Sequence, residues 1–315
     1  MTSPSAPFWI LGSGGQIGQA WLAELAARGL PARAFSRTEL DLESEESLAR
    51  FEQELRSLPL HERPRALVLT AAYTQVDKAE QPAEKIRAEA INAHAPGLLA
   101  KLAASLEIPF VHYSTDYVYE GTGTEPRSEK APVAPQNAYG LTKLRGDEAV
   151  ARAFEGRSTP WLVFRTSWVY DATGKNFFRT MLRLFQEKDS LSIVDDQWGA
   201  PSYAPHLARA SLEAFLNLSR ASDPKALSGV YHLVHSGFTT WHGFASAILA
   251  LARTRSVRLH SLSGIPSAQY PTPAKRPLNS RLSSSKLKQQ LGVELPHWEE
   301  GLRDCWQAWL RQAAH

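Results

Sequence analysis

The chain has 315 residues, which is enough for a large hydrophobic core and for two lobes. Its hydrophobic content of 43%, charged content of 21% and formal net charge of +3 are ordinary for a soluble globular protein, and no run of basic residues indicates a nucleic-acid partner. The single cysteine, Cys305, excludes an intrachain disulfide and a cysteine-based metal site, and we interpret it as a buried thiol.

The start of the chain gives no sign of a targeting segment. Residues 1–9 (MTSPSAPFW) lack the basic region and apolar stretch of a signal peptide. No apolar run is long enough to cross a bilayer. We therefore expect a cytoplasmic protein without a membrane partner.

The first predicted strand, residues 7–11 (PFWIL), runs into a glycine-rich turn and a helix at residues 19–28. Strand, glycine turn and helix form the context in which such a motif binds a dinucleotide. Glycines allow a pyrophosphate to approach the backbone, and the helix N-terminus offers it unpaired N–H groups. The turn carries a GxxGxxG pattern, a variant of GxGxxG, and its predicted binding residues are Gly12, Gly15, Gln16, Ile17 and Gly18.

The second predicted strand, residues 32–35, ends at Ser36 and Arg37. Sites that prefer NAD carry an Asp or Glu here for the ribose 2′-hydroxyl. A carboxylate would repel a 2′-phosphate, whereas Arg37 could pair with one, so the sequence favours NADPH and leaves NADH possible. Arg37 as a solvated loop residue is the alternative.

A third buried strand is predicted at residues 66–70 and ends at Ala71 and Ala72, whose small side chains would let a cofactor lie against the backbone. A helical pattern then runs from Pro82 to Leu106. Asn92 lies inside it, and we expect its side chain to bond to nearby backbone or water.

The fourth predicted strand, residues 108–113, leads into Ser114, Thr115 and Asp116. Open α/β sheets bind ligands at the carboxyl ends of their strands. Tyr139 and Lys143 follow at a spacing of one helical turn, so they share a helix face.

This spacing predicts a proton donor. A free phenol has a pKa of about 10, and an ammonium group one turn away would lower it. A hydroxyl such as that of Thr115 could steer a substrate oxygen towards Tyr139. Together the groups could protonate a carbonyl oxygen as it becomes an alcohol. The alternative is a chance YxxxK pattern with a solvated lysine and a packed tyrosine ring.

Strands and helices alternate through a fifth strand at residues 161–164, with an exposed Gly- and Pro-rich loop at residues 121–137. This order predicts an α/β, Rossmann-type doubly wound parallel sheet with helices on both faces. Beyond it we predict strands at 191–194 and 229–234, helices at 176–185, 205–218, 241–253 and 298–311, and a Pro-broken loop at 265–277. We expect residues 1–165 to form an NADP-binding domain and residues 166–315 mainly a smaller substrate-binding lobe, with segments returning to the sheet.

Several longer motifs occur in order, among them HYSTDYVYEGTG, NAYGLTKLRGDE, FRTSWVY, DDQWGAPS and YPTPAKRPLNSRL. Together they resemble the dTDP-4-dehydrorhamnose reductase family, in the extended short-chain dehydrogenase/reductase superfamily, over nearly the whole chain. The resemblance implies NADPH-dependent reduction of the C4 ketone of dTDP-4-dehydro-L-rhamnose to dTDP-L-rhamnose, for cell-surface polysaccharide such as O-antigen.

The resemblance also implies site residues. The catalytic set would be Thr115, Tyr139 and Lys143. The cofactor site would add Asp41, Leu42 and Tyr113 to the residues above, with Asp41 near the adenine edge. The substrate site would comprise Thr115, Asp116, Tyr139, Trp168 and Arg276, with Arg276 a partner for the diphosphate.

The chain departs from a magnesium-bridged dimer that some family members form through glutamates. Two of those positions carry Gln19-Ala20 and Pro205 here, and Glu299 alone matches. We therefore expect no required metal, with Mg²⁺ doubtful, and a monomer or a homodimer.

Other functions stay open. One alternative is a non-catalytic regulatory subunit, because the β subunit of methionine adenosyltransferase has a sequence similar to the STDYV motif. A reductase of another nucleotide-4-keto sugar would need a similar pocket. A dehydratase or epimerase is disfavoured, because dehydratases need an Asp-Glu pair after the threonine, and here Asp116 is followed by Tyr117.

Overall fold

The computed structural model describes residues 6–255 and 257–313. The first five of the residues considered for a signal peptide lie outside these ranges. Within the described ranges, six parallel strands form one sheet in the order β10-β5-β4-β3-β1-β2. Its strands are β1 (Phe8–Leu11), β2 (Ala32–Phe35), β3 (Ala66–Leu69), β4 (Phe110–Thr115), β5 (Trp161–Thr166) and β10 (Gly229–His232). The predicted doubly wound parallel sheet is confirmed.

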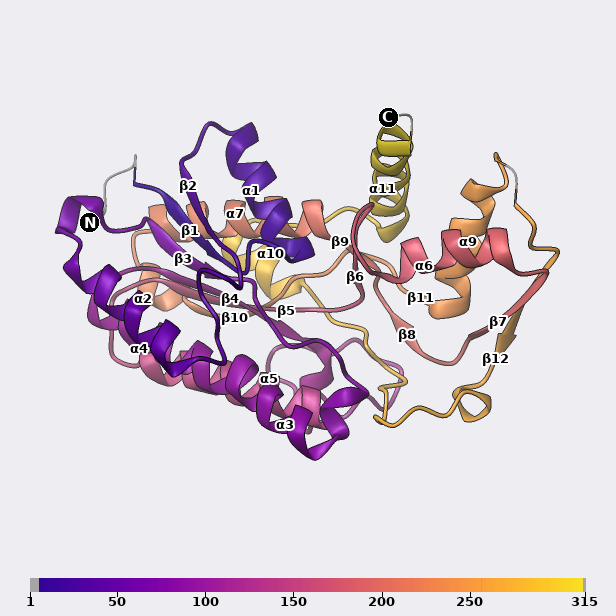
Figure 1. Cartoon of the computed structure of the whole chain (residues 1–315), viewed down its shortest axis with the longest axis horizontal. Helices are drawn as coiled ribbons and strands as arrows, with labels where there is room; N and C mark the ends of the chain where they lie inside the picture. The colour runs from indigo at the N-terminus through magenta and orange to yellow at the C-terminus, as the bar shows by residue number, and fades with distance from the viewer. Residues whose placement is uncertain (1–5, 256, 314–315) are drawn as a thin grey trace.

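Helices cover both faces of this sheet (Figure 1). One face packs against α1 (Gln16–Ala27), α7 (Ala204–Arg220) and α10 (Ser285–Leu291). The other packs against α2 (Glu45–Ser57), α4 (Ala95–Ser105) and α5 (Ala138–Ala153). Successive strand residues point to opposite faces, and both are buried, which explains the nearly continuous apolar runs of the strands.

The second half of the chain builds a further core beside the sheet (Figure 1). It contains α6 (Phe177–Glu187), α9 (Trp241–Ala252), α11 (Trp298–Ala313) and the parallel pair β7 (Ser190–Val194) and β12 (Ser261–Ile265). Cys305 lies in this core and is buried, as predicted. The segments that return to the sheet are β10, α7 and α10.

Short elements complete the described ranges. The short strands are β6 (Val169–Tyr170), β8 (Trp198–Gly199), β9 (Ser202–Tyr203) and β11 (Thr239–Thr240). The short helices are α3 (Pro82–Glu89) and α8 (Pro224–Leu227). The single turns are η1 (Leu60–Glu62), η2 (Lys78–Glu80), η3 (Ala90–His94), η4 (Asp116–Val118) and η5 (Ser267–Gln269). No helix of the described residues combines the length and hydropathy of a membrane span.

Some predicted boundaries move. Strand β4 begins and ends two residues later than predicted, so Ser114 and Thr115 are its last residues. Helix α1 begins earlier, at Gln16, directly after the glycine turn. Strand β12 escaped prediction because its serine-rich sequence has little apolar character, and it ends where the predicted Pro-broken loop begins.

The helix predicted from Pro82 to Leu106 is interrupted by the π turn η3, which contains Asn92. The Asn92 amide is fully buried, accepts from Tyr73 N at 2.9 Å and donates to Tyr73 O at 3.0 Å. It also donates to Thr142 Oγ1 at 3.2 Å. Asn92 therefore satisfies the backbone after β3 and ties it to helix α5, in agreement with the predicted structural role.

We expect Asn92→Ala to lower the free energy of unfolding by about 2–4 kcal/mol, because it leaves both polar backbone groups of Tyr73 buried without partners. Urea denaturation measures this loss. Asn217→Ala is the matched control, since this exposed amide makes one bond, to Leu291 O. An equal loss in both variants would contradict the structural role of Asn92.

Candidate active site

The predicted proton-transfer residues meet where β4 ends and α5 begins. Thr115 is the last residue of β4, and its hydroxyl accepts from Tyr117 N at 3.3 Å. Helix α5 starts beside it, capped by the Asn137 side chain, which accepts from Gly140 N at 2.8 Å. Tyr139 lies in the first turn of α5, and its phenol interacts with the Thr115 side chain, which lowers the Tyr139 pKa against the effect of burial. The structure thus places the predicted hydroxyl and phenol beside each other.

Lys143 lies one turn further along α5 and is almost completely buried, at 1% exposure. Its ammonium donates to Tyr113 O at 2.5 Å and lies 3.2 Å from His112 Nε2. Burial lowers the pKa of Lys143 to about 8, and the nearby Asp147 carboxylate opposes this shift. A solvated lysine, the alternative considered from sequence, is thereby ruled out.

The expected net lowering of the Tyr139 pKa does not occur in this arrangement. Burial raises the pKa of Tyr139 above its ordinary value, and the hydrogen bond with Thr115 acts in the opposite direction. The Lys143 ammonium is bonded to the carbonyl of Tyr113 instead. Desolvation of the phenolate outweighs the cation one turn away.

Asp116 begins the turn after β4 and is buried. Its Oδ1 accepts from Thr115 Oγ1 at 3.0 Å, whereas Oδ2 has no hydrogen-bond partner among the described residues. Burial raises the pKa of Asp116 to about 6, and hydrogen bonds with Ser280 and Thr115 oppose this shift. A buried carboxylate oxygen without a partner is a candidate contact for a substrate hydroxyl.

The glycine turn has the shape that a pyrophosphate requires. Gly12 has φ +98°, and a Cβ placed on it would lie 2.5 Å from Ala71 N. A Cβ on Gly18 would lie 2.3 Å from Gly12 O. Gly15 caps α1 without a side-chain bond, so N–H groups at this helix end stay available for an anion. The residues present therefore fit a dinucleotide phosphate.

Two other residues of the turn have structural partners. The Gln16 side chain accepts from Asn176 Nδ2 at 2.9 Å and so ties the turn to the start of α6. Ile17 packs against the core between α1 and the sheet. This links the glycine turn to the second core as well as to the sheet.

At the end of β2, Ser36 is bonded through its N and Oγ to Glu39 Oε2, both at 2.8 Å. The Arg37 side chain is 66% exposed, pairs with Glu43 and lies 3.8 Å from Asp41. A 2′-phosphate bound at Arg37 would compete with the carboxylates of Glu43 and Asp41 for the guanidinium. Arg37 is therefore accessible, although it already has partners on the protein.

Two predicted cofactor residues direct their side chains into the protein. Leu42 is buried in the core on the α2 side of the sheet. The Tyr113 phenol lies on the opposite face, where it accepts from Trp21 Nε1 at 2.7 Å and lies 2.5 Å from Ser211 Oγ. Only the Tyr113 carbonyl faces Lys143. The side chains of Leu42 and Tyr113 therefore belong to the core, which leaves only their backbone for the predicted cofactor contacts.

The predicted substrate residues of the second half lie around aromatic groups. Trp168 has φ +49°, an uncommon backbone conformation for an aromatic residue, and stacks on Trp241 with ring centres 3.7 Å apart. Arg276 donates to Asp77 Oδ2 at 2.6 Å and also bonds to Tyr117. Sequence reasoning did not assign Asp77 or Trp241 a role, and their positions are set by tertiary packing alone.

Arg276 and Trp241 line a cavity of about 480 Å³. Its other lining residues are Phe177, Thr180, Met181, Leu184, Leu191, Ser192, Ile193, Val194, Gln197, Tyr270 and Thr272. The cavity combines apolar and aromatic walls with a cation, the composition expected of a small-molecule site. It extends the candidate site into the second half of the chain.

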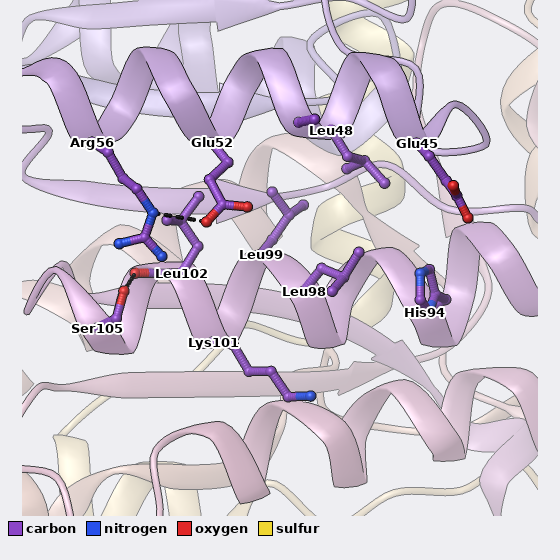
Figure 2. Close-up of a pocket in the computed structure, with 11 residues that line it drawn as sticks. Glu45, Leu48, Glu52, Arg56, His94, Leu98, Leu99, Lys101, Leu102 and Ser105 are labelled. Carbon is purple, nitrogen blue, oxygen red and sulfur yellow. Dashed lines mark hydrogen bonds and ion pairs between the residues drawn. The ribbon is translucent and has the colours of Figure 1, made fainter.

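A second hollow of about 510 Å³ lies between α2 and α4 (Figure 2). Leu48, Leu98, Leu99 and Leu102 form its apolar part, and charged side chains such as Glu52 and Arg56 surround them. None of the residues proposed for catalysis or for cofactor binding lines it. We therefore do not include it in the candidate site.

The three positions of the family's magnesium-bridging glutamates lie in three different helices. Gln19 lies in α1, Pro205 in the first turn of α7 and Glu299 in the first turn of α11. Within residues 6–255 and 257–313, no group of three or more His, Cys, Asp and Glu side chains is placed to hold a metal ion.

Asp116 gives stability a definite pH dependence. The folded state keeps its proton up to about pH 6, whereas an unfolded Asp loses it near pH 3.9. Between these values the folded state binds more protons, so the contribution of Asp116 to stability falls as pH rises. We expect Asp116→Asn to raise the free energy of unfolding by about 1–3 kcal/mol at pH 7.5 and by less at pH 4.5.

Urea denaturation of both proteins at the two pH values measures this difference. Asn keeps the oxygen that accepts from Thr115, so the comparison isolates the buried charge. Equal destabilisation by Asp116→Asn at both pH values would show that charge burial is not the dominant effect.

Known proteins match this chain in sequence and in structure. Residues 8–311 match the family described as the RmlD substrate binding domain. The dTDP-4-dehydrorhamnose reductase of Burkholderia thailandensis is 41% identical over 94% of this chain and 96% of its own. A crystal structure of the Clostridium acetobutylicum reductase has a TM-score of 0.84 and 30% identity, covering 98% and 99% of the two chains. The Bacillus anthracis reductase, solved in complex with NADP, has a TM-score of 0.84 and 29% identity, covering 96% and 99%.

These matches cover nearly the whole length of both partners, and the site residues lie within them. The chain therefore belongs to the dTDP-4-dehydrorhamnose reductases, a family of oxidoreductases.

Proposed function

We propose that this protein uses NADPH to reduce the C4 ketone of dTDP-4-dehydro-L-rhamnose to dTDP-L-rhamnose, with Tyr139 as the proton donor. The observation that carries the proposal is the placement of Thr115, at the end of β4, beside Tyr139, in the first turn of α5, with the buried Lys143 one turn further along that helix. Residues 1–165 would hold the cofactor and residues 166–315 mainly the sugar nucleotide. The protein would act in the cytoplasm, as a monomer or a homodimer, without a required metal.

The cofactor would supply a hydride to C4. The glycine turn at residues 12–18 would hold its pyrophosphate, and Arg37 its 2′-phosphate. The NADP complex of the Bacillus anthracis reductase supports NADPH as the cofactor. NADH stays possible, because the carboxylates of Glu43 and Asp41 already lie beside Arg37.

Tyr139 is prepared to donate its proton. Burial raises the pKa of Tyr139, so the phenol is protonated at neutral pH, as a proton donor must be. The Thr115 hydroxyl, bonded to this phenol, would orient the ketone oxygen beside it. When the proton leaves, the buried Lys143 ammonium on the same helix face would stabilise the phenolate electrostatically.

The second half would bind the nucleotide. The apolar cavity beside Trp241 and Arg276 would take the nucleoside part, and the guanidinium would bind the diphosphate in competition with Asp77. Asp116 and Trp168 would contact the sugar, since both follow the carboxyl ends of strands. The Oδ2 atom of Asp116 has no hydrogen-bond partner among the described residues, and the backbone of Trp168 is strained.

The regulatory-subunit alternative has no specific observation in its favour. It predicts NADPH binding without turnover of any dTDP-4-keto sugar. A reductase of another nucleotide-4-keto sugar predicts turnover, with a different substrate preferred. Both alternatives are separated from the proposal by the assay that follows.

We expect Tyr139→Phe to lower kcat by at least about 100-fold with dTDP-4-dehydro-L-rhamnose, because the proton donor is lost, while NADPH affinity stays within about threefold. NADPH absorbance measures turnover, and quenching of protein fluorescence measures binding. Thr115→Val and Thr115→Ser form a matched pair, since serine alone keeps the hydroxyl. Unchanged turnover in Tyr139→Phe would exclude it as the proton donor.

We expect Arg37→Ala to raise the KM for NADPH by about 10-fold and to change the KM for NADH by less than about twofold, because only NADPH carries the 2′-phosphate. The control is Arg50→Ala, which removes another exposed arginine. Parallel changes for both cofactors would assign Arg37 to the surface rather than to the cofactor site.

A further inference from the structure

Asp147 lies on α5 one turn beyond Lys143 and is 2% exposed. Its Oδ2 accepts from Arg165 Nε at 3.0 Å, and its Oδ1 has no hydrogen-bond partner among the described residues. Arg165 lies on β5 opposite Ser114 of β4, next to the Thr115 pair of the register. A buried carboxylate therefore lies on the same face of α5 as Lys143 and Tyr139.

Arg165 has a second hydrogen-bond partner besides Asp147. Its guanidinium donates to Tyr119 OH at 2.8 Å, and that hydroxyl lies 2.7 Å from His232 Nε2. His232 belongs to β10, and its Nδ1 lies 3.0 Å from Ser283 O. The position of Asp147 is therefore fixed by a buried chain of bonds that reaches the second half of the protein.

The Asp147 carboxylate affects the Lys143 ammonium because few other charged groups of the described residues lie close to that ammonium. The titratable groups that act on it are His112 of β4, whose Nε2 lies 3.2 Å from the ammonium, and Asp147, one turn along α5. Burial holds the pKa of His112 well below its ordinary value, so this ring is neutral. Asp147 is the anion whose field raises the pKa of Lys143, against the desolvation that lowers it.

We propose that Asp147, held by Arg165, is a positioning residue of the reductase site: its buried carboxylate, one helical turn from the buried Lys143, is the counter-charge for that ammonium. The inference rests on the proposed function for its effect on turnover. Its effect on Lys143 itself does not depend on which substrate the protein uses. Asp147 acts through Lys143 and contacts neither cofactor nor substrate in this account.

The direct test is a titration of Lys143 by NMR, with ¹³C-labelled lysine and the signal assigned by its loss in Lys143→Arg. In Asp147→Asn we expect the Lys143 midpoint to fall by about one pH unit, because the opposing anion is gone. Asp147→Glu should restore it, and Glu148→Gln, which removes the neighbouring exposed carboxylate, should leave it unchanged. An unchanged midpoint in folded Asp147→Asn would overturn the proposal.

The kinetic test is the pH profile of kcat/KM for the keto sugar. In Asp147→Asn, kcat/KM should fall by about 10-fold at pH 9 and by less than about twofold at pH 6, because it follows the protonated fraction of Lys143. A merely structural role would lower activity equally at both pH values and would contradict the proposal. If the wild type reduces no keto sugar, the proposed function fails, and the NMR titration still decides the role of Asp147.

Asp147→Asn leaves the buried Arg165 without its carboxylate, and such a variant can fail to fold. The double variant Asp147→Asn/Arg165→Gln removes both charges and so removes that cost. Its Lys143 midpoint should still lie below that of the wild type. A wild-type midpoint in the double variant would overturn the proposal.

Discussion

The site depends on one buried cation. The Lys143 ammonium lies beneath the first turns of α5, where it bonds to the Tyr113 carbonyl of β4. Placing a charge there is costly, so partners must compensate for its desolvation. Asp147 supplies the opposite charge, and helix α5 aligns both groups with Tyr139 on one face. The same helix therefore carries the phenol, the cation that would stabilise its phenolate and the anion behind that cation.

The two halves of the chain converge on this helix. Its N-cap, Asn137, donates to Lys275 O at 2.9 Å, so the loop that carries Arg276 is joined to the start of α5. Arg276 in turn pairs with Asp77, in the segment after β3. Residues proposed for the sugar nucleotide are thus held against residues proposed for catalysis. In this arrangement, substrate binding in the second half would be coupled to the geometry at Tyr139.

Sequence patterns predicted the parts that depend on local periodicity and on short motifs. They located the parallel sheet, the glycine turn and the contact of Thr115 with Tyr139, because strand ends and helical spacing fix these positions. They could not show that the Tyr113 side chain points to the opposite face of the sheet, where it meets Trp21 and Ser211. They also missed Asp147 and Arg165, whose pairing exists only when α5 packs on β5.

The pKa of Tyr139 is another property that the sequence patterns could not predict. Helical spacing indicated a nearby cation, but the depth of burial that raises the pKa is a tertiary property. The most direct test of the account is a crystal structure of the protein with NADP⁺ and dTDP-L-rhamnose. We expect the Tyr139 hydroxyl within hydrogen-bond distance of the sugar O4, with the nicotinamide C4 facing the sugar C4. A sugar O4 bonded elsewhere, with Tyr139 remote from it, would contradict the proposed proton transfer.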